Sequence, residues 1–258
     1  MKQALQFVVI FLALQILTGF IGGGIGRLLN HNGDIAALQL IVSSVVASVI
    51  CIAVFLLARW AEVSPRWLQS KQWGVMLWSV IAALGTIIPS TWMQEQVPEL
   101  PNLLEQEFDQ MMSGWWGYLA IGLLAPLSEE IVFRGAVLRS LLAAQKKPIT
   151  AIAISALLFS LVHLNPAQMP HAFLVGLLLG WMYWRTGSIV PAVAYHWTNN
   201  SVAYIIYHAY PDPNIHLNDI FKGSSLNVAL AVVFSLLILL PALYQLHLWM
   251  RHADEKAN

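Results

Sequence analysis

The chain has 258 residues, of which 58% are hydrophobic and only 10% are charged, and its net charge is zero. A soluble domain carries about 25% charged residues, so this composition excludes an ordinary soluble protein and indicates a membrane protein. The zero net charge gives no reason to expect a nucleic-acid partner, and the single cysteine, Cys51, excludes an internal disulfide and a cysteine zinc cluster.

Several apolar runs reach about 20 residues, the length at which a helix crosses the hydrocarbon of a bilayer. We interpret the first run as a retained span because it is long and no clear cleavage site follows it. The sequence therefore predicts an all-α polytopic membrane protein, a single domain (1–258) built as a bundle of about eight transmembrane helices. The expected spans are 4–26, 36–58, 73–93, 115–141, 149–164, 170–185, 188–208 and 226–249.

Glycines recur four residues apart in the first and sixth expected spans. Small residues at this spacing let two helices approach closely within a membrane. We therefore expect tight helix contacts at these positions. The pairs are Gly19/Gly23, Gly22/Gly26 and Gly176/Gly180.

Basic residues are shared unevenly between the two sides of the membrane that eight alternating spans define. With the N-terminus inside, ten of the 13 Lys and Arg residues fall inside, two fall outside and Arg134 lies within a span. Cytoplasmic loops carry such an excess, so the sequence predicts a multi-pass protein with both termini inside, for which a bacterial inner membrane is the expected location. The inside residues are Lys2, Arg59, Arg66, Lys71, Arg139, Lys146, Lys147, Arg185, Arg251 and Lys256, and the outside residues are Arg27 and Lys222.

The connection between the third and fourth expected spans, residues 94–114, carries five acidic residues and no basic one. In this topology it lies outside, and part of it, 102–112, can form an interfacial helix. Two interpretations stay open for this connection, a solvated link between helices and a gate for a substrate.

Two glutamates and an arginine fall within the fourth expected span. Ionisable side chains in a membrane are costly, so each is a functional candidate. On a helix Glu130 and Arg134 share a face and can pair, whereas Glu129 is turned by about 100° and need not join them. Glu129 is therefore the better candidate for a reactive carboxylate. The alternative is an ion-pair network that only locks helices together.

Histidine and asparagine side chains supply the other polar groups within the spans. His163 is expected near the end of the fifth span, on the same helix face as Phe159. His196 and Asn200 share a face of the seventh span and form a pair of donors that can stabilise a developing oxyanion. A structural interpretation stays open for each group. His163 could be a satisfied core histidine or an interfacial one, and His196 and Asn200 could form interhelical hydrogen bonds.

Three further polar residues receive no role. Asn199 faces about 100° away from its neighbour in the chain, and His171 and His216 are expected in loops or at helix boundaries.

One carboxylate and one histidine can hold and deprotonate a water, while a second histidine and an asparagine can hold a carbonyl oxygen. Together these groups suit acyl hydrolysis, provided that their helices meet.

Three motifs, each in its own expected span, resemble the CPBP family, the CAAX prenyl proteases and bacteriocin-processing proteins that are also called the ABI family. They are E-E-x-x-x-R from Glu129, F-x-x-x-H from Phe159 and H-x-x-x-N from His196, and the resemblance covers roughly 112–208. It implies an all-helical intramembrane endopeptidase with a catalytic core in this segment, acting in the lipid bilayer on a membrane-associated peptide or protein substrate.

The resemblance also implies roles for the matching residues. Glu129 corresponds to the general base, and His163 to a residue that helps to activate water. His196 and Asn200 correspond to the oxyanion site. The remaining matches, Glu130, Arg134 and Phe159, correspond to supporting residues.

A zinc site is the alternative for the same residues, since Glu129, His163 and His196 with a water would complete four ligands. No H-E-x-x-H motif occurs, and a metal site would leave the general base unassigned. We therefore expect no metal and no other cofactor.

Two other functions stay open at this point. A membrane protein of this family that does not cleave could bind a partner as an immunity or chaperone-like factor. A proton-coupled transporter also uses buried Glu and His residues, although the sequence shows no duplicated halves.

Overall fold

The computed structural model describes residues 1–29, 34–64, 73–210 and 215–250, and within these ranges every element is a helix. The all-α prediction is therefore confirmed for the part of the chain that the structure describes. Several basic residues on which the orientation depends lie outside this part, so the orientation stays a prediction, as does the single domain. They are Arg66, Lys71, Arg251 and Lys256.

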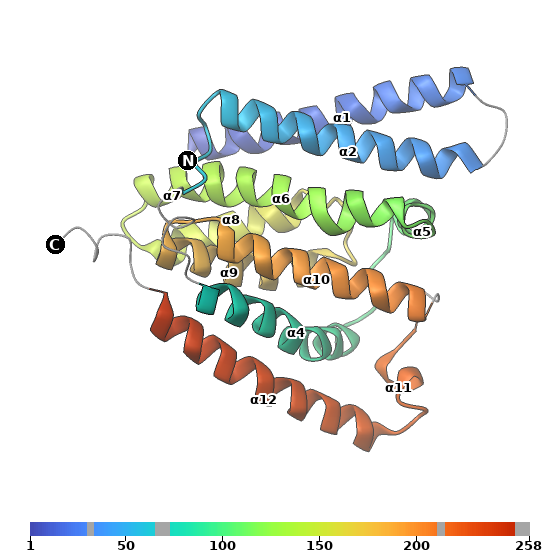
Figure 1. The fold of residues 1–258 in the computed structure, drawn as a ribbon, viewed down its shortest axis with the longest axis vertical. Coiled ribbons are helices and arrows are strands. Elements are labelled where there is room, and N and C mark those ends of the chain that lie inside the picture. Colours follow the sequence, from blue (N-terminus) through green and yellow to red (C-terminus); the bar gives the residue numbers. More distant parts are fainter. Residues whose placement is uncertain (30–33, 65–72, 211–214, 251–258) are drawn as a thin grey trace.

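The helices lie with their long axes roughly along one direction (Figure 1). At one edge α1 (Lys2–Leu29) packs against α2 (Asp34–Leu57), and at the opposite edge α4 (Trp73–Glu95) packs against α12 (Ser225–Trp249). The helix α1 begins at the end of the bundle where α12 ends (Figure 1). The residues of the three motifs all belong to the middle of the bundle.

The middle of the bundle contains one long helical stretch and three separate helices. The stretch runs without interruption from residue 118 to 144 and alternates between π- and α-helical segments. Two short helices, α5 and α11, lie at the end of the bundle away from the start of α1 (Figure 1). The bounds are η1 Tyr118–Leu124, α6 Ala125–Glu130, η2 Ile131–Leu138, α7 Arg139–Ala144, α8 Pro148–Leu161, α9 Met169–Thr186, α10 Val190–Ala209, α5 Glu105–Met112 and α11 Leu217–Ile220.

A helix lies at each of the eight expected positions, but eight transmembrane spans are not confirmed. Among the described residues, four helices are long and apolar enough to cross a membrane, and these are α1, α2, α4 and α12. The helix α8 has only 14 residues and ends at Leu161, so it is about 21 Å long, less than the roughly 30 Å of hydrocarbon. The predicted span 149–164 was therefore too long.

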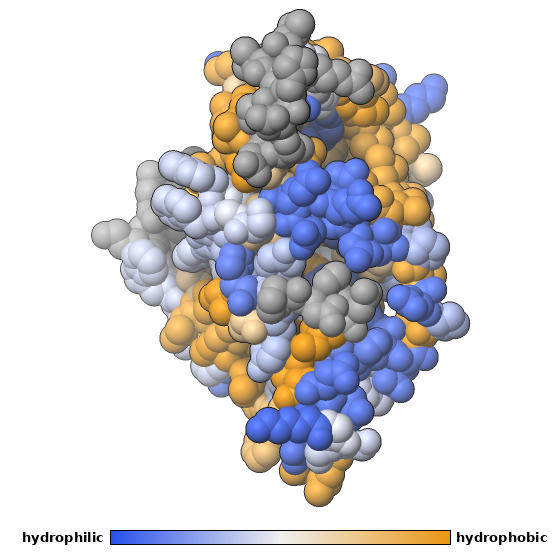
Figure 2. Space-filling model, turned by 90° about the vertical axis from the view of Figure 1, so that its right-hand side faces the viewer, coloured by the Kyte–Doolittle hydropathy of each residue, from blue (hydrophilic) through white to orange (hydrophobic). Residues whose placement is uncertain are grey.

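Apolar side chains cover the outside of the bundle. Along α12, large side chains such as Phe234, Leu237 and Leu240 are exposed. Figure 2 views the end where α5 and α11 lie, and there hydrophilic residues gather across the face while apolar residues occupy its margins. Apolar flanks with a polar end are what a bilayer requires, so the chain is an integral membrane protein.

Close helix contacts are confirmed at some of the predicted glycines. A Cβ atom on Gly176 would lie 3.1 Å from the Ala156 Cα atom, and one on Gly180 would lie 2.9 Å from Ile152 Cγ2, so α8 and α9 touch here. Gly22 likewise faces Ser43 of α2. Gly19 has nothing within 4 Å, so the prediction was wrong there. The surroundings of Gly23 and Gly26 lie outside what the structure describes.

Substitution of Gly176 by Ala should destabilise the protein, with Gly19→Ala as the matched control. The new methyl group would press on the α8 backbone and on the Phe159 ring, and overpacking of this kind costs roughly 1–3 kcal/mol. At Gly19 the methyl group meets open space and improves helix propensity. Thermal unfolding in detergent micelles should therefore give a lower Tm for Gly176→Ala only. Equal Tm values for the two variants would contradict the close α8–α9 contact.

Candidate active site

The two glutamates lie in α6, between the two π-helical segments. In a π-helix the carbonyl oxygen of Ile121 would accept from the N–H of residue 126, but this residue is Pro126, which has none. The Ile121 oxygen instead accepts a hydrogen bond of 3.0 Å from Asn200 Nδ2. A proline inside the helix thus creates the acceptor that joins η1 to α10, next to the glutamates.

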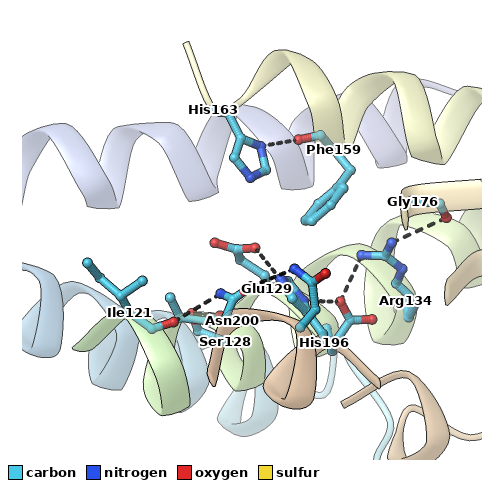
Figure 3. Close-up of polar contacts among 12 residues, drawn as sticks. Ile121, Ser128, Glu129, Arg134, Phe159, His163, Gly176, His196 and Asn200 are labelled. Atoms are coloured by element: carbon cyan, nitrogen blue, oxygen red, sulfur yellow. Dashed lines mark hydrogen bonds and ion pairs between the residues drawn. The ribbon is translucent and has the colours of Figure 1, made fainter. Parts of the chain in front are cut away.

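Glu130 joins Arg134 to His196, and Figure 3 shows these two partners in the site. Glu130 is 0% exposed, and its Oε1 atom accepts from Arg134 Nη1 at 3.0 Å and from His196 Nδ1 at 2.9 Å. Arg134 is equally buried, donates through Nη2 to the Gly176 carbonyl oxygen at 3.3 Å, and lies 4.4 Å above the Phe159 ring. The Glu130–Arg134 pair therefore connects the long helical stretch with α8, α9 and α10.

Glu129 lies beside this pair but keeps contact with the surroundings. Its side chain is 19% exposed, and its Oε2 atom lies 3.8 Å from His196 Nε2. This distance is too long for a direct hydrogen bond, but a single water can contact both atoms. The split that the helix geometry predicted, with Glu130 paired to Arg134 and Glu129 outside that pair, is what the structure contains.

His163 does not lie on a helix, contrary to the expectation. The helix α8 ends two residues earlier, and Leu164, which follows His163, has a φ angle of 51° that reverses the chain. The Nδ1 atom of His163 lies 2.8 Å from the Phe159 carbonyl oxygen, which can only accept, so Nδ1 donates and Nε2 is left for another partner. In Figure 3 the His163 ring points toward the Glu129 carboxylate from the opposite side of the site.

The connection 94–114 holds the turn that bears His163. Asn165 is 0% exposed, accepts from the Leu103 N–H at 3.0 Å and donates to Asn102 Oδ1 at 2.8 Å. The Ala167 N–H donates to the Pro101 carbonyl oxygen at 3.2 Å. The connection is therefore docked on the site rather than a free link, and α5 confirms the expected helix within it.

The asparagine pair of α10 contains a contact that the sequence reasoning missed. Asn199 was given no role, yet its Nδ2 atom donates to Asn200 Oδ1 at 3.3 Å. His171 lies near the start of α9, as expected for a boundary residue, but its ring is close enough to Asn199, His163 and His196 for these side chains to affect its electrostatics. The run of two asparagines in an otherwise apolar helix was the feature of the sequence that could have indicated this contact.

The residues do not fit the zinc alternative. Among the described residues, Glu129, His163 and His196 included, no group of three or more His, Cys, Asp or Glu side chains is arranged to hold a metal ion. Glu129 and Glu130 approach the two ring nitrogens of His196, and Nδ1 is occupied by the bond to Glu130. The expected absence of a cofactor stays a prediction.

Residues 111–202 match the family model of the Rce1-like proteins, described as type II CAAX prenyl endopeptidase Rce1-like. The family resemblance is confirmed. The Rce1-like segment contains every residue of the three motifs, and together with the apolar helices it indicates a membrane-embedded protease that acts on peptide substrates. Searches of curated proteins and of solved structures found no match.

Glu130→Gln should destabilise the Rce1-like segment far more than Glu129→Gln. Loss of the Glu130 charge leaves the fully buried Arg134 guanidinium without a counter-ion, which costs roughly 3–5 kcal/mol. Glu129 is partly exposed and supports no such pair, so its amide variant should stay within about 1 kcal/mol of wild type. Unfolding by SDS titration in micelles, followed by circular dichroism, measures both. Equal losses in the two variants would contradict the assigned difference.

Proposed function

We propose that this chain is an intramembrane endopeptidase that hydrolyses a peptide bond of a membrane-associated peptide or protein, with Glu129 as the general base. The proposal rests on one observation. A partly exposed carboxylate lies near one nitrogen of an imidazole whose other nitrogen is bonded to a buried carboxylate. Glu129 Oε2 lies 3.8 Å from His196 Nε2, while Glu130 Oε1 lies 2.9 Å from Nδ1 of the same ring. A base, an oriented donor and its support thus meet in one place.

In the proposed reaction a water binds between Glu129 and His163. Glu129 takes one proton of the water, and His163 Nε2 accepts a hydrogen bond from the other, since its Nδ1 is already committed to the Phe159 carbonyl oxygen. The hydroxide oxygen attacks the carbonyl carbon of the substrate and gives a tetrahedral intermediate. When the C–N bond breaks, Glu129 returns its proton to the leaving amine.

His196 and Asn200 stabilise the oxygen of this intermediate. One hydrogen of Asn200 Nδ2 is bound to the Ile121 oxygen, and the second is available for the substrate. Two carboxylates and the Arg134 guanidinium carry a net charge of −1, and a proton on each nitrogen of His196 makes the cluster neutral. Neutrality favours burial, and the Nε2 proton then serves as the second donor to the oxyanion.

The proposal uses no metal. As a zinc ligand, Glu129 could not act as the base. Among the described residues no three His, Cys, Asp or Glu side chains are arranged to bind one metal ion, which supports a metal-free mechanism. The substrate class follows the family, so a prenylated peptide with a C-terminal CAAX sequence is the first substrate to test, beside the same peptide without the prenyl group.

Glu129→Gln should abolish cleavage in proteoliposomes, with Glu99→Gln as the matched control. Both substitutions replace a carboxylate by an amide, but Glu99 is exposed in the connection 94–114. Loss of a general base lowers the rate by about 100-fold or more, so wild type and Glu99→Gln should release product while Glu129→Gln should not. A metal chelator should leave the wild-type rate unchanged.

Other results would contradict parts of this proposal. Cleavage by Glu129→Gln at the wild-type rate would refute the general base. Stoichiometric zinc that is required for activity would support the metal alternative. Ion flux without cleavage would indicate a transporter, and partner binding without cleavage in wild type would indicate a non-cleaving binding protein.

A further inference from the structure

Two polar side chains outside the three motifs, Asn199 and His171, each carry a buried atom without a hydrogen-bond partner. Asn199 is 7% exposed and His171 is half-buried, and the unpaired atoms are Asn199 Oδ1 and His171 Nδ1. Buried polar atoms nearly always have a hydrogen-bond partner, so these two unpaired atoms require an explanation. The two side chains are close enough for Asn199 to influence the electrostatics of the His171 ring.

The orientation of the Asn200 amide is fixed from both of its ends. Its Nδ2 atom donates to the Ile121 carbonyl oxygen at 3.0 Å, and its Oδ1 atom accepts from Asn199 Nδ2 at 3.3 Å. In the flipped orientation a carbonyl oxygen would face the Ile121 oxygen, and an NH2 group would face the Asn199 NH2 group. Asn199 therefore helps to decide which way the NH2 group of Asn200 points.

The orientation of the Asn199 amide is constrained in the same way. Asn199 must turn its NH2 group toward Asn200, so its Oδ1 atom faces the other way and needs a donor. A neutral imidazole carries one N–H, and His171 is the neighbouring side chain with an unused ring nitrogen. A neutral donor also suits this place, since His171 lies near His163 and His196, where a further positive charge would be repelled.

We propose that His171 and Asn199 are positioning residues for Asn200. His171 donates to Asn199 Oδ1, Asn199 donates to Asn200 Oδ1, and the second N–H of Asn200 is thereby aimed at the carbonyl oxygen of the substrate. This inference rests on the proposed function. It assigns a task to a run of three side chains, His171–Asn199–Asn200, of which only the last belongs to a motif of the family.

The test compares His171→Phe and Asn199→Leu with wild type in proteoliposomes, and His208→Phe is the matched control. His208 lies at the far end of α10, where its ring stacks on Tyr204 at 4.4 Å. The first two variants should lose about tenfold in kcat, which corresponds to one hydrogen bond of about 1.4 kcal/mol. KM should stay nearly unchanged, because the bond from Asn200 to the substrate oxygen strengthens in the transition state. His171→Gln keeps an N–H donor and should recover most of the loss, and His208→Phe should cleave as wild type does.

The background variant Asn200→Ala separates positioning from a general structural effect. If His171 acts through Asn200, then His171→Phe lowers kcat in wild type but causes no further loss in Asn200→Ala. An equal loss in both backgrounds, or no loss in wild type, would overturn the proposal.

A second readout does not depend on cleavage. The Tm losses of His171→Phe and Asn199→Leu should be less than additive in the double variant, because both remove the same bond. Fully additive losses would overturn the contact. If wild type cleaves no peptide, the proposed function fails and the positioning role fails with it, whereas the Tm series still decides whether the two side chains are joined.

Discussion

A carboxylate that is completely buried has to be neutralised and hydrogen-bonded, and in this protein Glu130 imposes that requirement on its surroundings. The cost of burying an unpaired charge is several kcal/mol. The Glu130 Oε1 atom is satisfied by Arg134 from its own helical stretch and by His196 from α10, and Arg134 reaches on to the Gly176 carbonyl oxygen in α9. The helices that carry these groups must therefore meet at one point.

The same arrangement gives the two adjacent glutamates different surroundings. Neighbours in a helix point about 100° apart, so only Glu130 can face Arg134 while Glu129 faces the more open side of the site. His196 lies between the two carboxylates and is oriented by the buried one. In the proposed mechanism the buried carboxylate therefore orients the imidazole beside which Glu129 acts as the base.

Local patterns in the sequence predicted those features that depend on spacing along one helix. The Glu130–Arg134 pair follows from four residues on one face, and the α8–α9 contact follows from Gly176 and Gly180. The resemblance supplied the set of motif residues, and the family match covers all of them.

Other features depend on partners that are distant in the sequence. Asn165 is held by Asn102 and Leu103, more than 60 residues earlier, and no local pattern indicates this. His163 was placed on a helix because the apolar run continues past Leu161, whereas the chain turns at Leu164. The number of spans stays a prediction, because helices that line a polar site, such as α10, carry His and Asn residues that lower their apolarity.

A double-mutant cycle on unfolding in micelles measures whether Glu130 and His196 join the long helical stretch to α10. The cycle uses Glu130→Gln, His196→Ala and the double variant. A hydrogen bond to a charged group contributes roughly 1.5–3 kcal/mol. The double variant should therefore lose less unfolding free energy than the sum of the two single losses, by about that amount. A double-variant loss within about 0.5 kcal/mol of the sum of the single losses would show that Glu130 and His196 act independently, and would contradict a bond between the two helices.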